Sequence, residues 1–333
     1  MKPSDLSRAA GIARAVGLAA AGRRVPLIAS WNVTFRCNLR CAYCGVCRPG
    51  VREGGTDEAL RVLRELAALG TRYVGLSGGE PFVRADLGTI VGAAADLGMQ
   101  VRVQTNGTLA AGRIGEVRRA AEVQVSLDGP ADVHDAVRGE GVFAAVEATV
   151  AACRDAGIAV LADTVLSAAN VGRIDDLLAT LDRLGIGTYV QPIDAAYAGE
   201  RDGAGALFPD PAACRAAIDG LIEHRRTGGR AVANSVSGLR HLRSWPDLPP
   251  LPCAVWRLMV AVDPDGAIGT CDMAPGYEQG LVRGAASVRE AVASLPRDCR
   301  CPRCGTGAGI DFNLAARGDP GALLGMLVRR LVA

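Results

Sequence analysis

The chain has 333 residues, of which 49% are apolar and 22% are charged, and its formal net charge at pH 7 is +2. This composition is typical of a soluble globular protein, and the length allows one large domain with an appendage. The near-neutral charge argues against nucleic acid or an anionic membrane as an obligatory partner. No stretch of the sequence is long and apolar enough to predict a membrane span.

The first 25 residues predict an amphipathic helix. Its most apolar part, Gly11–Gly22, is short and is interrupted by Arg14, and no small-residue cleavage site follows it. We therefore do not interpret it as a signal peptide. The eleven cysteines of the chain fall into groups that suggest metal binding rather than disulfides. A reducing cytoplasm is the location that fits this usage.

Cys37, Cys41 and Cys44 follow the strand-like stretch 26–35 with the spacing CxxxCxxC. Three thiolates on one loop can hold three irons of a 4Fe–4S cluster and leave the fourth iron without a protein ligand. A cluster with an open iron can bind and reduce a ligand. Cys47 extends the pattern by another CxxC step, so a zinc or ferredoxin-like site that includes Cys47 is the alternative.

From residue 26 to about residue 192, short β-branched runs alternate with helical runs. The expected strands are Ile28–Val33, Tyr73–Ser77, Val101–Thr105, Val123–Leu127, Ile158–Val165 and Thr188–Gln191. The expected helices include Asp57–Leu69 with Thr56 as N-cap, Gly141–Ala156, and Val171–Leu184 with Asn170 as N-cap. Six βα units predict an α/β fold with a parallel sheet and right-handed crossovers. The length is short for a complete eight-fold barrel, so we expect a partial (β/α)6 barrel over residues 26–200.

The remainder of the chain predicts three further segments. Residues 201–250 form a linking helical segment, with a helix from about Pro211 to Arg226. The proline-rich run Leu248–Pro252 marks a break. Residues 251–318 predict a small cysteine-rich α+β domain, and residues 319–333 predict a C-terminal helix.

The cysteine-rich segment contains a predicted hairpin. Met259–Val262 and Ala267–Thr270 flank the turn residues Asp263–Gly266. Such a hairpin would bring Cys253 and Cys271 together.

Ser77–Pro81 reads Ser-Gly-Gly-Glu-Pro and stands at the end of the second expected strand. Together with the cysteine run, it resembles the radical S-adenosylmethionine (radical SAM) family over roughly the first two hundred residues. This resemblance implies that the amino and carboxylate groups of S-adenosylmethionine (SAM) chelate the open iron. One electron then cleaves SAM to methionine and a 5′-deoxyadenosyl radical, which takes a hydrogen atom from the substrate.

The resemblance also assigns roles around the cluster. Tyr43 matches an aromatic residue that packs on adenine. Gly78 and Gly79 let the backbone approach a ligand closely. Glu80 can accept a hydrogen bond from the methionine ammonium. An ordinary strand and turn is the alternative interpretation of this motif.

Two later segments are similar to SAM-contacting segments of the family. Thr105-Asn106-Gly107 either shapes the SAM site or is simply a turn. The other segment resembles one that places a serine and an arginine, here Ser126 and Arg138, on the SAM carboxylate. An arginine fork suits both carboxylate oxygens, but a surface arginine is the alternative.

Four polar residues of this half keep open roles. Asp128 can cap a turn or reach the ribose, and His134 is interpreted as structural. Asp163 and Gln191 face either the barrel cavity or the helices, which strand alternation alone does not decide.

The second cysteine group resembles the auxiliary-cluster region that follows many radical SAM barrels. Its one-cluster version, called twitch, needs four ligands, whereas the two-cluster version, called SPASM, needs more cysteines than follow here. The four expected ligands of a second 4Fe–4S cluster are Cys253, Cys271, Cys301 and Cys304. Cys299 is a spare or alternative ligand, and a zinc ribbon is the alternative site.

These features predict an enzyme of oxidoreductase or lyase type. The leading hypothesis is hydrogen abstraction from a polar, sugar-like or nucleoside-like natural-product intermediate, with dehydrogenation slightly favoured. Residues 1–24 can hold only one helix, which favours a small molecule over a precursor peptide. Peptide modification is the second hypothesis, and a non-catalytic iron–sulfur or zinc protein is the third. An external one-electron reductase such as flavodoxin or ferredoxin is the expected electron donor.

Overall fold

The structure is a computed structural model that describes residues 14, 17–19, 21–48, 50–194, 198, 204–272, 277–297, 301, 303–323 and 325. Most of the expected N-terminal helix, the end of the expected C-terminal helix and Cys299 lie outside these residues. No helix within the described ranges is long and apolar enough to cross a membrane.

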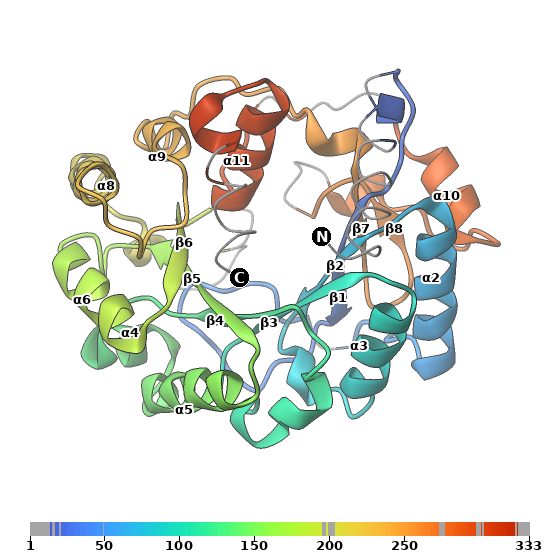
Figure 1. Cartoon of the computed structure of the whole chain (residues 1–333), viewed down its shortest axis with the longest axis horizontal. Coiled ribbons are helices and arrows are strands. Elements are labelled where there is room, and N and C mark those ends of the chain that lie inside the picture. Colours follow the sequence, from blue (N-terminus) through green and yellow to red (C-terminus); the bar gives the residue numbers. More distant parts are fainter. Residues whose placement is uncertain are drawn as a thin grey trace.

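The core of the molecule is one curved, eight-stranded sheet with the strand order β6-β5-β4-β3-β2-β1-β7-β8 (Figure 1). The first six strands are Ile28–Thr34 (β1), Tyr73–Gly78 (β2), Gln100–Thr105 (β3), Glu122–Ser126 (β4), Ala159–Leu166 (β5) and Gly187–Pro192 (β6). Each pairs in parallel with the next along the chain. The sheet does not close, because β6 and β8 are its edges, and the predicted partial barrel is confirmed.

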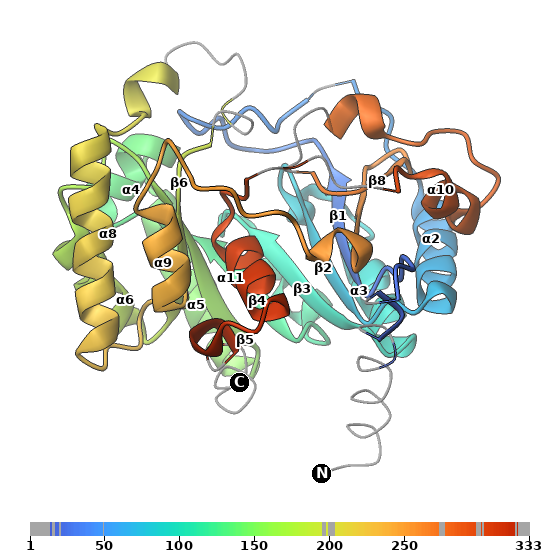
Figure 2. The same cartoon turned by 90° about the horizontal axis from the view of Figure 1, so that it is seen from above.

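Helices cover the outer face of this sheet (Figures 1 and 2). They are Thr56–Leu69 (α2), Leu87–Asp96 (α3), Ala131–Arg138 (α4), Val142–Asp155 (α5) and Ile174–Leu184 (α6). Alternate strand residues such as Val101 and Val103 point outward and are fully buried in the main core. The residues between them, such as Gln104, point to the concave face and are only half-buried. The concave face is therefore the polar face of the sheet.

Two predicted helix starts are wrong, because the expected caps have partners elsewhere. The N-cap of α2 is Gly55, and the Thr56 hydroxyl donates instead to Asp86 at 2.8 Å. Helix α6 begins at Ile174 rather than after Asn170. The Asn170 amide donates to the carbonyl oxygens of Asp128 and Val165, so it ties down the loop that follows β5.

The predicted hairpin is confirmed, and it extends the barrel sheet. Met259–Val262 (β7) pairs antiparallel with Ile268–Gly269 (β8). β7 also pairs in parallel with β1, from Ile28 to Trp31. The cysteine-rich segment therefore begins as an addition to the same sheet, and the domain boundaries 201–250 and 251–318 stay predictions.

In the described part of the chain, the α-helices that follow β6 include Pro211–Arg226 (α8), Val236–Leu242 (α9), Val288–Ser294 (α10) and Gly307–Ala316 (α11). Short 3-10 helices span Pro81–Val83, Ala111–Val117, Ala204–Leu207, Val255–Arg257 and Tyr277–Gly280. Helix α11 packs against α9 and the edge strand β6 (Figure 1). A Cβ on Gly307 would stand 2.6 Å from the Val190 carbonyl oxygen, so glycine allows this close approach.

Candidate active site

The loop that carries Cys37, Cys41 and Cys44 leaves β1 at the carboxyl-end edge of the sheet, where ligand sites of parallel sheets lie. Its start is hydrogen-bonded to the end of β2. The backbone N–H of Gly79 donates to the Thr34 carbonyl at 2.8 Å, and that of Glu80 donates to the Arg36 carbonyl at 2.9 Å. The cysteine run and the Gly-Gly-Glu-Pro motif therefore form one backbone unit.

The two glycines of the motif are required by this contact. A Cβ on Gly78, whose φ is +123°, would lie 2.0 Å from the Thr34 carbonyl oxygen. One on Gly79 would lie 2.2 Å from the Arg36 carbonyl oxygen and 3.1 Å from the Cys37 Cβ. Both positions thus require glycine because of contacts within the chain itself. A close approach of these glycines to SAM stays a prediction.

Glu80 is fully buried and holds the loop after β3. Its carboxylate accepts hydrogen bonds from the Thr105 hydroxyl at 2.9 Å, the Asn106 backbone N–H at 2.7 Å and the Phe82 backbone N–H at 3.0 Å. Burial raises the pKa of Glu80 to about 7, although these donors act to lower it. Glu80 is therefore a support for the Thr-Asn-Gly segment, and its contact with the SAM ammonium stays a prediction.

Asn106 connects that segment to the first cysteine. Its side-chain amide lies 3.8 Å from the Cys37 sulfur and donates to the Asn38 side chain at 3.0 Å. Its side-chain oxygen accepts from the Thr108 backbone N–H at 2.9 Å. The segment therefore shapes the cysteine loop, and its role at the SAM site stays a prediction.

The thiols of the loop are close enough to influence one another electrostatically. Burial raises the pKa of Cys37 most, and the thiols of Cys41 and Cys47 raise it further. Burial also raises the pKa of Cys41, where Cys44 adds to the effect and the Arg138 guanidinium opposes it. Iron binding replaces the thiol protons, so a cluster would remove this cost.

The donor set fits a three-ligand 4Fe–4S cluster, because three half-buried or buried thiols share one loop beside an arginine. Among the described residues, no three His, Cys, Asp or Glu side chains stand close enough to hold a single metal ion. Cluster ligands each bind a different iron, so they stand farther apart than ligands of one ion. The ligand assignment itself stays a prediction.

Tyr43, Asp128 and Arg138 form a buried polar triad beside the loop. The Arg138 Nε donates to Asp128 at 2.6 Å, and the Tyr43 hydroxyl donates to the same oxygen at 3.2 Å. Arg138 also donates through Nη2 to the Tyr43 hydroxyl. Burial alone would raise the pKa of Asp128, but the Arg138 charge, His134 and the hydrogen bonds from Arg138 and Val165 together outweigh it and hold the pKa below its usual value.

This triad restricts the roles predicted for two of its members. The Tyr43 ring packs with Val137 and Ile193, so it anchors the cysteine loop on α4. Arg138 uses Nε and Nη2 within the chain, and its Nη1 makes no hydrogen bond to a described residue. A carboxylate can therefore reach Arg138 through Nη1 and through the second hydrogen of Nη2. Ser126, at the end of β4, is half-buried on the concave face.

His134 and Asp128 are joined by a hydrogen bond. The buried His134 ring accepts the Asp128 backbone N–H through Nδ1 at 3.1 Å. Burial lowers the pKa of His134 to about 4, so the ring is neutral. Both residues are structural parts of the loop that follows β4, in agreement with the interpretation of His134.

The predicted auxiliary cysteines lie in three segments of the chain. Cys253 precedes β7, Cys271 follows β8, and Cys301 and Cys304 precede α11. All four are half-buried. The Cys304 carbonyl lies 3.2 Å from the His241 ring, which fixes its segment to α9. Their joint ligation of a second cluster stays a prediction.

Asp163 faces the concave side of the sheet. Its carboxylate accepts hydrogen bonds from the side-chain amides of Gln104 at 2.9 Å and Gln124 at 2.6 Å. These glutamines were not predicted as site residues, although polar residues at matching positions of neighbouring strands were a usable signal. Gln191 accepts the Gly307 backbone N–H at 3.2 Å, so it also positions α11.

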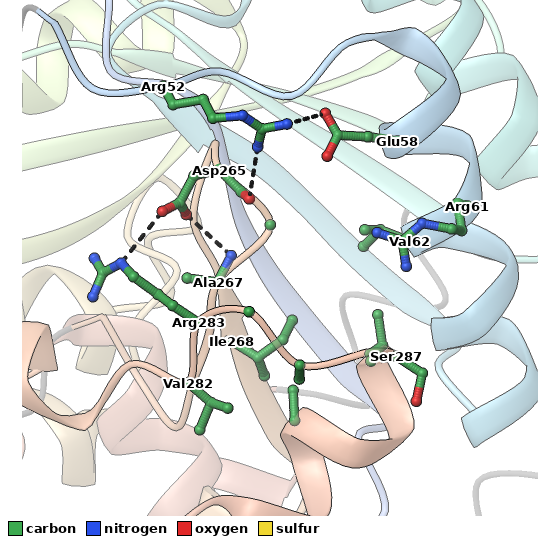
Figure 3. Close-up of a pocket in the computed structure, with 15 residues that line it drawn as sticks. Arg52, Glu58, Arg61, Val62, Asp265, Ala267, Ile268, Val282, Arg283 and Ser287 are labelled. Carbon is green, nitrogen blue, oxygen red and sulfur yellow. Dashed lines mark hydrogen bonds and ion pairs between the residues drawn. The ribbon is translucent and has the colours of Figure 1, made fainter.

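A separate pocket of about 300 Å³ lies between α2, the β7–β8 hairpin and α10 (Figure 3). Its arginines are paired within the protein: Arg52 with Glu58 at 2.6 Å and Arg283 with Asp265 at 3.3 Å. Because these charges cancel in pairs, no ligand class follows from the pocket.

Comparison with known proteins decides the family. A model of the radical SAM superfamily matches residues 31–184. The chain is 33% identical over 267 residues to mycofactocin maturase MftC of Mycobacterium ulcerans, a match that spans 76% of this chain and 70% of the relative. This chain belongs to the radical SAM superfamily. The protein is a radical SAM enzyme, with SAM and 4Fe–4S clusters as its cofactors.

The match to a heme synthase spans a smaller share of that relative. An AdoMet-dependent heme synthase of Methanosarcina barkeri is 37% identical over 172 residues, or 49% of each protein. Among solved structures, anSMEcpe with bound AdoMet and a peptide has a TM-score of 0.62 at 16% identity and covers 81% of each chain. Streptococcus suis SuiB bound to SAM has a TM-score of 0.60 at 15% identity and covers 74% of this chain and 60% of its own. These structural matches show the shared fold.

Proposed function

We propose that this radical SAM enzyme modifies a peptide by abstracting a hydrogen atom from it. The observation that carries the proposal is the similarity to a maturase, MftC, over 70% of that protein. Structures of SuiB with the precursor peptide SuiA and of anSMEcpe with a peptide share the fold and support it. The comparisons favour this function over the sugar-like or nucleoside-like substrate that the sequence led us to expect.

In this proposal, different residues of the chain bind the cluster and SAM. Cys37, Cys41 and Cys44 would hold three irons, and Arg138 would take the SAM carboxylate through Nη1, together with Ser126. When bound, the cluster and SAM supply the 5′-deoxyadenosyl radical that takes the hydrogen atom. The concave face beneath them would receive the reacting part of the peptide.

The auxiliary cluster belongs to the same proposal. Cys253, Cys271, Cys301 and Cys304 would bind it completely, which leaves no open iron. The auxiliary cluster would therefore either accept an electron from the substrate or shape the substrate pocket. Flavodoxin or ferredoxin would deliver the electron that starts the reaction.

A small-molecule substrate is the second candidate, because heme synthase relatives reach 37% identity over about half of their length. The two candidates predict different donors of the abstracted hydrogen. Two compounds should be incubated separately with reconstituted enzyme, SAM and dithionite. One is a deuterated synthetic peptide with the sequence of a short open reading frame beside the gene of this enzyme, and the other is iron coproporphyrin III. The proposal predicts deuterium in 5′-deoxyadenosine and a mass change in the peptide. Turnover of the porphyrin without any change in the peptide would contradict it.

A further inference from the structure

A layer of polar side chains crosses the concave face of the sheet below the cysteine loop. Gln104, Gln124 and Asp163 lie on the adjacent strands β3, β4 and β5. The register pairs Gln104 with Gln124 and Ser126 with Asp163. The Asp163 carboxylate is thus held by two neutral amides, 2.9 Å from Gln104 and 2.6 Å from Gln124.

The charge of this carboxylate is not neutralised by the chain. Within the described ranges, no arginine or histidine nitrogen lies within 4 Å of Asp163. The two arginines whose charge influences it are paired elsewhere. Arg102 contacts Glu122 at 2.6 Å, and Arg138 contacts Asp128 at 2.6 Å. Burial raises the pKa of Asp163 to about 6, so the group is mostly ionised at pH 7.5.

The side-chain amide of Gln124 contains a second acceptor, its Oε1, that no donor in the described part of the chain contacts. Gln124 is 3% exposed, and its Oε1 has no hydrogen-bond partner among the described residues. A buried acceptor without a partner destabilises the fold, so it marks a place where a donor is missing. This oxygen belongs to the same amide group that donates to Asp163. A group with several N–H donors and a positive charge would satisfy both acceptors together.

The position of this layer links it to the reaction. Asp163 is in register with Ser126, the residue predicted to contact the SAM carboxylate. On the other side, Asp163 pairs with Tyr189 of β6. Strand β6 is the edge strand against which α11 packs. A ligand held at Asp163 would therefore lie on the concave face, beside Ser126 and the predicted SAM site.

We propose that Asp163 and the Gln124 Oε1 bind an ammonium or guanidinium group of the substrate and so set its position relative to the radical. The cation site itself is argued from the polar layer alone. The inference rests on the proposed function for one point, namely that the cation is a lysine, an arginine or the terminal amine of the peptide. Asp163 acts here as a specificity-determining residue and moves no proton.

The site is tested first with a probe that is not a peptide. Dissociation constants of n-butylammonium and 1-butanol are measured by ligand-observed NMR on the reconstituted enzyme with SAM. Asp163→Asn should weaken n-butylammonium about tenfold and leave 1-butanol unchanged. Gln124→Leu should weaken it less, and Asp182→Asn, on the outer helix α6, should have no effect. Equal n-butylammonium affinity in the wild type and Asp163→Asn would overturn the inference, because a site completed within the chain shows no charge preference.

A second measurement separates this inference from the proposed function. The peptides acetyl-Ala-Lys-Ala-amide and acetyl-Ala-norleucine-Ala-amide differ only in the side-chain charge. The wild type should prefer the lysine peptide about tenfold, and Asp163→Asn should lose that preference. Binding of both peptides without preference overturns the inference and leaves peptide modification standing. Binding of n-butylammonium but of neither peptide supports the cation site and contradicts a peptide substrate.

Discussion

The cysteine loop and the concave polar layer treat their buried polar groups in opposite ways. Around the loop, Glu80 and Asp128 each accept three hydrogen bonds from the chain, and one of those to Asp128 comes from Arg138. In the layer below, Asp163 has only amide donors and the Gln124 Oε1 has no partner in the described part of the chain. The two carboxylates beside the loop are thus satisfied without a substrate, and the acceptors of the layer are not.

This difference separates two kinds of specificity. A self-satisfied loop has one geometry, which suits a cofactor that is the same in every turnover. Unsatisfied acceptors are costly until a matching group arrives, so they discriminate between substrates. The predictions below test the two regions in order of expected effect.

The largest expected effect on stability comes from Arg138→Ala. It leaves the Asp128 charge, which is 1% exposed, buried without its cation. Breaking such a pair costs about 3–5 kcal/mol, measured by denaturant unfolding. The double variant with Asp128→Ala should be more stable than Arg138→Ala alone, because the unpaired charge is gone. A single variant as stable as the wild type would show that the triad does not hold the loop.

Gly79→Ala should disrupt the unit formed by the two motifs. The added Cβ would stand 2.2 Å from the Arg36 carbonyl oxygen, so the cysteine loop must shift. We expect a loss of about 3 kcal/mol in unfolding free energy and reduced cluster incorporation, read from the iron content. Gly75→Ala, in the strand β2 that precedes Gly79, is the matched control, since nothing lies within 4 Å of its new Cβ. Equal behaviour of the two variants would refute the steric argument.

The smallest expected effect is the pH dependence contributed by Asp163. Its pKa is raised to about 6, so its stabilising contribution is complete below about pH 4 and is lost as the pH rises through 6. Arg102, Glu122 and Arg138 are the charged groups that influence it. From pH 5.5 to 7.5 the wild type should therefore lose about 0.8 kcal/mol relative to Asp163→Asn.

Denaturant unfolding at both pH values checks this, with Asp182→Asn as the exposed control. A wild type that gains stability relative to Asp163→Asn as the pH rises would mean that the carboxylate has a cation partner after all.

Much of the barrel was predictable, because its signals are local. The six strands were predicted to within two residues at each end, and helix α8 has its predicted bounds, since periodicity and turn residues act over short distances. The caps Thr56 and Asn170 were wrong because each side chain bonds a residue from another element.

The unpredicted features depend on contacts between distant segments. The pairing of β7 with β1 joins opposite ends of the chain, and no local pattern encodes it. The cysteine spacing predicted the ligand loop, but the triad of Tyr43, Asp128 and Arg138 needs the packing of α4 beside it. The orientation of Asp163 follows from strand register, which alternation alone does not give.

The central claim is that the open cluster of this loop cleaves SAM, and the direct measurement is 5′-deoxyadenosine formation by the anaerobically reconstituted enzyme with dithionite. The wild type should form it, whereas Cys37→Ala/Cys41→Ala/Cys44→Ala should form none and lose about half of the iron. Cys153→Ala, which removes a buried thiol of α5, should retain both. Continued cleavage of SAM by the triple variant would contradict the account.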